Sequence, residues 1–450
     1  MTNDYGADNF NRTALLLAHE LGDPVEGVDR HNRSHVSIVA GSLVCATRTG
    51  HAALMTAVKT AVRAFGAVDV ALADPTAVVL GGPEAGVGLA TAVTSEGAHL
   101  VDVAAVASSD SVICLGNCPD SVTPRAKWLT GYWTGWTAAT APTVDLAQKQ
   151  VPVDGNVLAA IGAGALVVAE RFFSLLPDSQ VDVGRRSRKV DLWAPDRDHD
   201  AAPPELMYCP AHWWLLGLGH LGQGYAHAIS WLDFAEPSDV QVVLQDTQVT
   251  VKANHSTGVL TPAGSEGDRK TRLAAAALDK CGYQTVIIER RMTRSTPAHD
   301  EDVHVALVGV DNLATRRGID DYNWRTTIDV GIGSGAHDFD GMTILRFPGR
   351  PSAGMPAWQD QPDMSAHQPQ LTAPGLDACG QTELNGVAVG ASFVGAIAGA
   401  LAVAEACRPL HGGVAHAVQC RELRADETEM VTTDPGRLPV AASLKTCPDA

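Results

Sequence analysis

One octapeptide occurs twice in this chain of 450 residues, and it limits the folds that the chain can adopt. Residues 163–170 read AGALVVAE and residues 398–405 read AGALAVAE, so the copies differ at one position. Ala-rich helices also match by chance, but a weaker pair, SVICLGN from Ser111 and HVALVGVDN from His304, falls at the corresponding place in each half. An internal duplication explains both pairs, and it predicts two domains of one fold.

Both halves alternate apolar segments with Ala-rich helical segments, as expected for a parallel sheet with crossover helices. The first half opens with a helix-like segment at 9–21, and its further segments are 35–40, 52–65 (helical), 68–73, 76–80 and 111–115. In the second half we expect strands at 213–217, 240–245, 285–289 and 303–310, and helices at 223–231 and 269–280. The predicted fold class is α/β, with two tandem Rossmann-like, doubly wound domains.

The domain boundaries follow from changes in composition. Residues 185–205 are charged and Pro-rich without periodicity, so they are interpreted as a linker. A first domain is then expected at 1–184, a second at 206–412, and a C-terminal extension at 413–450.

Charge, cysteine usage and hydropathy exclude several classes of function. A formal net charge of -18 would repel a phosphate backbone, so we expect a protein partner and no nucleic acid. The nine cysteines include no CxxC pair, which argues against a structural zinc site. Residues 387–403 contain too many Ala and Gly for a convincing membrane helix, and the N-terminus does not resemble a signal peptide. We therefore expect a cytoplasmic protein that does not bind a membrane.

A glycine-rich motif marks the second half as the one that carries chemistry. Gly217, Gly219 and Gly222 form GLGHLG between an apolar strand and a helix, where they would give a tight turn and let phosphate approach the backbone. Asp246 ends the next strand and is placed to accept hydrogen bonds from ribose hydroxyls. The alternative is an ordinary tight turn in an α/β domain.

Further residues favour ATP over a nicotinamide cofactor. Lys270 starts a helix within GDRKT, where its ammonium could pair with phosphates. Asp311 and Asn312 end a strand at the edge where open sheets bind ligands, and Asp311 could hold Mg²⁺ on a triphosphate. A dehydrogenase needs neither group. The alternative interpretations are a solvated helix lysine for Lys270 and an Asx turn after the strand for Asp311 and Asn312.

In these motifs the chain resembles the ThiF-like adenylating enzymes, which include the ubiquitin-activating enzymes. The likeness runs through GLGHLG, Asp246, Asn254, Lys270 and the stretch DNLATRRGID from Asp311, to the helix AVGASFVGAIAGALAVAE. It is strongest to bacterial ubiquitin-activating-type enzymes, as in Bil-type antiviral operons. It implies ATP and Mg²⁺ as cofactors, and Asn254 and Asn312 join the expected nucleotide-binding residues.

The resemblance also implies a role for the first half. NFNRTALLLAHELG is similar to the segment that opens these enzymes, and its arginine, Arg12, would contact the ATP phosphates of the paired domain. The first half has VAGSLVCATRTG in place of the glycine motif and Gly116 and Asn117 in place of the DN pair. An intramolecular pseudo-dimer is therefore expected, with an inactive first half and an active second half. Gln248 departs from the family, which has an acidic residue there, and no arginine follows Asn254.

Transfer beyond the adenylate requires a nucleophile, and Cys379 is the candidate. It lies in LDACGQTELNG, within the region at about 348–385 where the resemblance places a crossover loop. The implied reaction is adenylation of the C-terminal glycine of a ubiquitin-like protein, then thioester formation on Cys379 and transfer to a conjugating enzyme. The alternatives are an adenylase of a peptide or sulfur-carrier protein that forms no enzyme thioester, and a non-catalytic or NAD-linked Rossmann protein.

Overall fold

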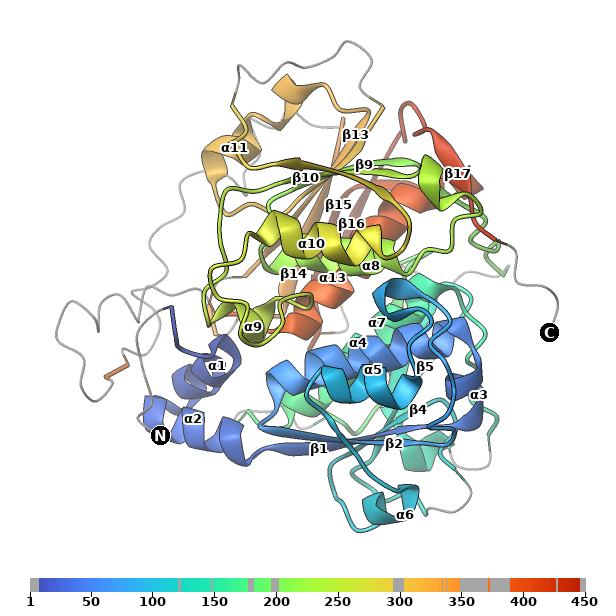
Figure 1. Ribbon diagram of the computed structural model, residues 1–450, viewed down its shortest axis with the longest axis vertical. Coiled ribbons are helices and arrows are strands. Elements are labelled where there is room, and N and C mark those ends of the chain that lie inside the picture. Colours follow the sequence, from blue (N-terminus) through green and yellow to red (C-terminus); the bar gives the residue numbers. More distant parts are fainter. Residues whose placement is uncertain are drawn as a thin grey trace.

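Two α/β halves, one above the other in Figure 1, make up the computed structural model. The residues that it describes are 8–119, 123–146, 149–176, 182–195, 202–293, 303–333, 335–336, 338–348, 371–372, 389–425 and 428–445.

The first half is built on a seven-stranded mixed sheet. In spatial order its strands are β3 (His99–Leu100), β2 (Ala67–Leu72), β1 (His35–Ala40), β4 (Val112–Leu115), β5 (Leu129–Thr134), β6 (Thr137–Pro142) and β7 (Arg188–Asp191). The first five run parallel, and β6 and β7 continue the sheet antiparallel. The helices of this half are α1 (Arg12–Leu21), α2 (Pro24–Arg33), α3 (Ser42–Ala46), α4 (Arg48–Ala64), α5 (Leu89–Ser95), α6 (Val103–Val106) and α7 (Val157–Phe173), with 3-10 turns η1 (Gly82–Glu84) and η2 (Thr143–Leu146).

The second half is built on an eight-stranded mixed sheet. Its strands in spatial order are β11 (Gln284–Ile288), β10 (Gln241–Gln245), β9 (His212–Leu216), β12 (Val305–Val308), β13 (Thr326–Ile332), β14 (Gly341–Phe347), β15 (Ala415–Glu422) and β16 (Thr428–Thr433). A separate small sheet pairs β8 (Tyr208–Pro210) with β17 (Ala441–Ser443). The helices are α8 (His220–Ser230), α9 (Asn254–Thr257), α10 (Lys270–Asp279), α11 (Leu313–Arg317) and α13 (Ser392–Cys407), with 3-10 turns η3 (Pro237–Asp239), η4 (Ile319–Tyr322) and η8 (Arg408–His411).

The two large sheets share one strand order. In each, the first strand lies in the interior, the second and third strands flank it on one side, and the fourth and fifth continue the parallel part on the other. The antiparallel strands then follow in chain order, and β16 is an addition of the second half. The α/β fold class is therefore confirmed, but the antiparallel strands were not predicted.

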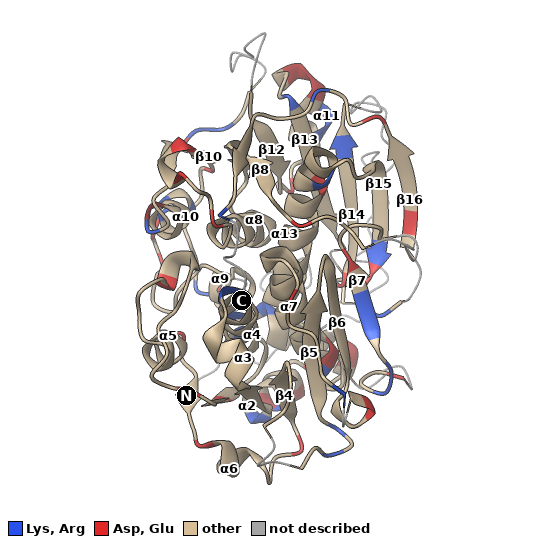
Figure 2. Ribbon diagram, turned by 90° about the vertical axis from the view of Figure 1, so that its right-hand side faces the viewer, with Lys and Arg blue, Asp and Glu red and all other residues tan. Residues whose placement is uncertain are grey.

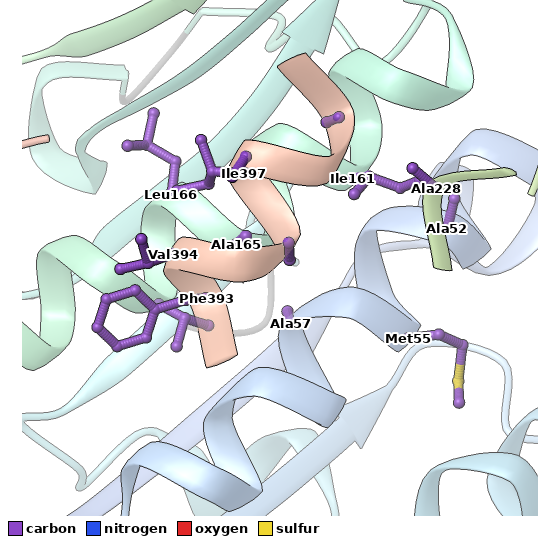
Figure 3. Close-up of a cluster of buried hydrophobic side chains, with 14 of the residues drawn as sticks. Ala52, Met55, Ala57, Ile161, Ala165, Leu166, Ala228, Phe393, Val394 and Ile397 are labelled. Atoms are coloured by element: carbon purple, nitrogen blue, oxygen red, sulfur yellow. The ribbon is translucent and has the colours of Figure 1, made fainter. Parts of the chain in front are cut away.

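A layer of long helices joins the halves. α4 and α7 of the first half face α8 and α13 of the second, between the two sheets (Figure 1). Figure 3 shows Phe393 and Ile397 of α13 beside Ala165 and Leu166 of α7, and Ala57 of α4 beneath them. These residues belong to one hydrophobic cluster that extends through both halves. Burial of apolar surface therefore holds the two halves together.

Equivalent glycines of the repeated octapeptide allow the helices of this layer to approach closely. A Cβ added at Gly164 of α7 would lie 2.3 Å from the carbonyl oxygen of Ala53 on α4. A Cβ added at Gly399 of α13 would lie 2.3 Å from the carbonyl oxygen of Gly224 on α8. The octapeptide thus performs the same packing task in each half.

Two sequence-based predictions differ from the structure. Residues 185–205 were expected to be a linker, yet Arg188–Asp191 forms edge strand β7, whose two basic residues lie close to β15 in Figure 2. Residues 76–80 were expected to be extended, but the backbone N–H and hydroxyl of Thr76 both donate to Oδ1 of Asp74 and form a turn. An isolated bridge between Val78 and Gly88 is the only β-pairing recorded for this stretch within the described residues.

One helical segment in the described part of the chain, Ser392–His411, is long and apolar enough to cross a membrane. The protein itself buries 94% of its apolar window. The segment is therefore accounted for as a core helix of the layer between the sheets.

Candidate functional site

The glycine motif forms a tight loop between β9 and α8. Gly217 has a φ of 83°, which favours glycine, and a Cβ on Gly222 would lie 1.9 Å from the carbonyl oxygen of Gly217. Gly219 precedes α8 without a side-chain cap, and nothing lies within 4 Å of the position that its Cβ would take. The loop therefore leaves open space at the N-terminus of an 11-residue helix, where backbone N–H groups favour an anion.

Asp246 fixes this loop from the end of β10. Its Oδ2 accepts a hydrogen bond of 2.6 Å from the backbone N–H of Leu218, and its Oδ1 accepts one of 2.7 Å from that of Gln248. Each carboxylate oxygen retains a further acceptor site, so a ribose hydroxyl could still donate to it. The residue predicted to contact ribose is therefore also the residue that holds the glycine loop.

Lys270 lies close to Asp246 and Asp311. The Lys270 side chain is buried at the start of α10, and its Nζ donates 2.7 Å to Oε1 of Gln248. Burial lowers the pKa of Lys270, while the nearby carboxylates of Asp246 and Asp311 act in the opposite direction. Gln248, the departure from the family pattern, thus contacts Lys270 through a neutral oxygen.

Asp311 and Asn312 lie beyond the end of β12 but are placed differently. Asn312 caps α11, because its Oδ1 accepts from the backbone N–H of Thr315 at 3.0 Å. Asp311 is exposed, and its carboxylate is close enough to Lys270 to act on the pKa of that lysine. In the described part of the chain no group of three or more His, Cys, Asp and Glu could hold a metal ion. One carboxylate still fits Mg²⁺, which usually keeps several waters and binds substrate phosphates in addition.

The first half supplies Arg12 to this region. Its backbone N–H donates 2.9 Å to the hydroxyl of Ser256 on α9, and the backbone N–H of Ala253 donates 2.8 Å to the carbonyl of Asp8. The Nη1 of Arg12 is buried without a hydrogen-bond partner among the described residues. Burial lowers the pKa of Arg12, and Asp8 partly opposes this effect. An unsatisfied buried guanidinium nitrogen fits an anionic ligand such as a phosphate.

Asn254 begins α9, the helix that packs against α1 and whose Ser256 accepts from Arg12. Its Oδ1 accepts 2.9 Å from the backbone N–H of Val251, so the amide oxygen shapes the turn before α9. Of the residues predicted from the sequence, the structure therefore places Asn254 with Arg12, and Lys270 with Asp246 and Asp311. Cys379 and most of the expected crossover loop lie outside the described residues.

An ion pair between Arg316 and Asp329 was only partly predicted from the sequence. The sequence indicated Arg316 or Arg317 as part of the DN motif, and Arg316 is the one directed inward. Its Nε lies 3.3 Å from Oδ1 of Asp329 on β13, and its Nη2 donates to the carbonyl of Val330 at 2.9 Å. Burial raises the pKa of Asp329 to about 7, against the influence of Arg316. The pair attaches α11 to the sheet and so positions the DN motif.

The corresponding edge of the first half is built differently. Gly41 leads directly into the short helix α3, in place of a glycine loop, and only Thr47 separates α3 from the long helix α4. The side-chain oxygen of Asn117 accepts from the backbone N–H of Val151 at 2.9 Å, so this position serves the local fold. A cavity of about 470 Å³ lies elsewhere, between β7 and β15, where Arg188 is paired with Glu170 at 3.1 Å. We assign it no ligand.

Comparisons with known proteins agree with the two-half organisation. A family model described as the BilD N-terminal domain matches residues 35–192, and one described as the BilD C-terminal domain matches residues 209–413. The bacterial E1-like protein BilD of Collimonas sp. (strain OK412) is 34% identical over 334 residues, which are 68% of this chain and 71% of that protein.

Solved structures of E. coli MccB give a weaker match. One has 13% sequence identity and a TM-score of 0.33, over 51% of this chain and 64% of the MccB chain, which is less than two thirds of it. A structure of MccB with ATP is 15% identical with a TM-score of 0.31, over 51% of this chain and 65% of that one.

Proposed function

Because the chain belongs to the BilD family of bacterial E1-like proteins, we propose that it uses ATP to adenylate the C-terminal glycine of a ubiquitin-like protein. The observation that carries this proposal is the unsatisfied buried guanidinium nitrogen of Arg12, supplied by the first half beside the second-half elements of the nucleotide site. A Rossmann domain that only binds a nucleotide has no need of such a residue.

Each residue has a role that its position supports. The loop of Gly217 to Gly222 and the N-terminus of α8 would hold phosphates, and Asp246 would accept from the ribose. Lys270 and Arg12 would stabilise the negative charge that develops as pyrophosphate leaves. The attacking group is the terminal carboxylate of the partner: its oxygen bonds to the α-phosphorus, and the bond to the pyrophosphate oxygen breaks.

Asp311 would hold Mg²⁺ in this site, with phosphate oxygens and water as the other ligands. The ion would add positive charge near the leaving pyrophosphate. Asn312 acts indirectly in this proposal, because its side chain caps α11 and thereby fixes the backbone after Asp311.

We propose further that the two halves act as an intramolecular pseudo-dimer. Their shared strand order and the equivalent glycines Gly164 and Gly399 support this arrangement. The first half would be inactive, since Gly41 and α3 replace the phosphate-binding loop, and its contribution would be Arg12.

Cys379 is proposed as the thiol that receives the activated acyl group. Its thiolate would attack the acyl carbon of the adenylate, AMP would leave, and a conjugating enzyme would accept the thioester in the next step. An adenylase that passes its product on without a thioester is the competing possibility.

ATP–pyrophosphate exchange tests the proposal. The purified chain is mixed with ATP, Mg²⁺, labelled pyrophosphate and a bacterial ubiquitin-like protein that ends in glycine. Label should enter ATP only when the partner is present with its glycine intact, and removal of that residue should abolish the signal. No exchange with the intact partner would refute adenylation. Exchange without a thiol-sensitive adduct would select the enzyme that forms no thioester.

A further inference from the structure

The turn at residues 254–261 carries Asn254, one of the residues proposed to bind the nucleotide, and it makes hydrogen bonds to both halves. It begins with Asn254, and its Ser256 hydroxyl accepts from the backbone N–H of Arg12 at 2.9 Å. The placement of Arg12 therefore depends on the placement of this turn.

Arg63 of α4 reaches across from the first half and binds the turn through its backbone. Its Nε donates 3.0 Å to the carbonyl of Gly258, and its Nη2 donates 2.9 Å to the carbonyl of Thr261. Its Nη1 donates 2.6 Å to the carbonyl of Lys59, within α4. The side chain is 1% exposed, so the three nitrogens of the guanidinium group bind three carbonyls in a place that water does not reach.

The charge of Arg63 is balanced within the first half. Glu96 lies 3.7 Å from its Nη1, and Glu84 lies 3.0 Å from Nζ of Lys59, which also contacts Glu96. Two cations and two carboxylates thus form a buried cluster. Because the cluster is neutral overall, Arg63 can be held as a rigid donor facing the second half.

The helix that follows the glycine loop binds the same turn from the other side. The backbone N–H of Leu260 donates 2.9 Å to Oε1 of Gln223 on α8, and Nε2 of Gln223 donates 2.8 Å to the Thr261 hydroxyl. The space is filled, since a Cβ on Gly258 would lie 2.6 Å from Oε1 of Gln223. The turn is therefore held between α4 of one half and α8 of the other.

We propose that Arg63 is a positioning residue for the nucleotide site of the opposite half. It fixes the 254–261 turn through two carbonyls and thereby sets the places of Asn254 and Arg12, without itself touching the nucleotide. This inference rests on the proposed function and identifies a second contribution of the first half to that site. Without Arg63, each carbonyl would lose its donor from the first half: that of Gly258 would keep the backbone N–H of Thr261, and that of Thr261 would keep Nδ1 of His255, so the turn would be released from α4.

Equilibrium binding of MgATP and hydrogen exchange test this role on the full chain. Arg63→Lys keeps the charge opposite Glu96, but one ammonium cannot match the fork of donors that reaches both carbonyls. We expect it to weaken MgATP binding about tenfold, in line with the loss of about one net hydrogen bond. Amide exchange should accelerate in residues 254–261 and stay unchanged in α7 and α13.

Arg30→Lys is the matched control, because Arg30 also donates to a backbone carbonyl, that of Leu175 at 3.1 Å, but within the first half. Gln223→Met releases the turn from the α8 side and should reproduce the accelerated exchange at 254–261. Unchanged MgATP affinity and unchanged exchange in Arg63→Lys would overturn the inference. If the wild-type protein binds MgATP but shows no pyrophosphate exchange with its partner, the proposed function fails while the role of Arg63 is still decided by the binding comparison.

Discussion

Glu170 and Glu405 occupy corresponding places in the two halves: each ends one copy of the repeated octapeptide, and each is fully buried. Glu170 ties α7 to the next strand, β7, through Arg188 at 3.1 Å. Glu405 ties α13 to the next strand, β15, by accepting from the backbone N–H of His416 at 2.9 Å and from Nε2 of Gln419 at 2.6 Å. The octapeptide thus carries a helix packing surface and an anchor to the sheet.

Glu405→Gln should destabilise the protein more than Glu170→Gln. Burial opposes ionisation of Glu405, but Arg408, 2.7 Å away, outweighs it together with His416 and Arg346, and the pKa of Glu405 is lowered. Removing its charge leaves buried Arg408 uncompensated, at a cost of about 3 kcal/mol. Burial raises the pKa of Glu170, so its charge contributes less, and we expect about 1 kcal/mol. Urea unfolding of both variants measures the difference, and equal losses would contradict it.

Asp311→Ala should abolish ATP–pyrophosphate exchange and leave the fold intact. The side chain is exposed, so its removal costs little stability, but it takes away the carboxylate proposed to hold Mg²⁺. Exchange should fall at least about 100-fold, as for other losses of charge stabilisation in a transition state. Asp102→Ala, which removes an exposed carboxylate of the first half, serves as the control. Full exchange activity in Asp311→Ala would refute the magnesium assignment.

Arg12→Ala should lose most of the adenylation activity, about 100-fold, although Arg12 belongs to the first half. The contact that anchors α1 on α9 is made by the backbone of Arg12 and survives the substitution. Exchange kinetics measured beside Arg33→Ala, whose side chain is 68% exposed on α2, isolate the effect. Kinetics equal to those of the wild type would mean that the N-terminal segment is structural only.

His227 should make the protein sensitive to acid. Burial lowers its pKa to about 3, and Lys59 and Arg63 add to this effect. The unfolded chain, with a pKa of about 6.5 at this residue, therefore takes up a proton first, so stability is lost as pH falls below about 6.5. Between pH 6.5 and 5 the loss is about 2 kcal/mol.

His227→Gln removes this titration. Its Tm should fall less than that of the wild type between pH 7 and 5, whereas His99→Gln, at a side chain 73% exposed, should follow the wild type. Parallel Tm curves for His227→Gln and the wild type would show that His227 is not the titrating group.

Local patterns predicted the parallel strands of the core, because the apolar pattern that indicates a strand lies within a few consecutive residues. The prediction of 35–40 matches β1, and that of 240–245 matches β10 to within one residue. Asp246 and Lys270 were proposed as site residues for the same reason, since fold rules place ligands at strand ends and helix starts. The charged and Pro-rich composition of 185–205 gave no indication of β7, whose residues form a strand by pairing with β6 at the edge of the sheet.

Arg63 and Gln223 gave no signal in the sequence. Arg63 lies in the last turn of the Ala-rich helix α4, and its acceptors in the second half are the carbonyls of Gly258 and Thr261, nearly two hundred residues away. Every residue type carries a backbone carbonyl, so the residue types at those positions do not indicate that they accept hydrogen bonds from Arg63. Contacts of this kind depend on how the two halves pack, and only the folded structure supplies that.

Cys379 provides the sharpest separation between the two kinds of adenylating enzyme. If its thiol accepts the acyl group, incubation with ATP, Mg²⁺ and the partner should give a heavier species on a non-reducing gel that disappears on addition of a thiol reductant. Cys379→Ala should abolish that species and keep pyrophosphate exchange, because adenylation comes first and uses other residues. Cys420→Ala changes a half-buried cysteine of β15 and should keep both the reducible species and the pyrophosphate exchange.

An adduct that persists in Cys379→Ala would move the role to another cysteine. Exchange with no adduct in the wild type would mean that the adenylate is passed on directly.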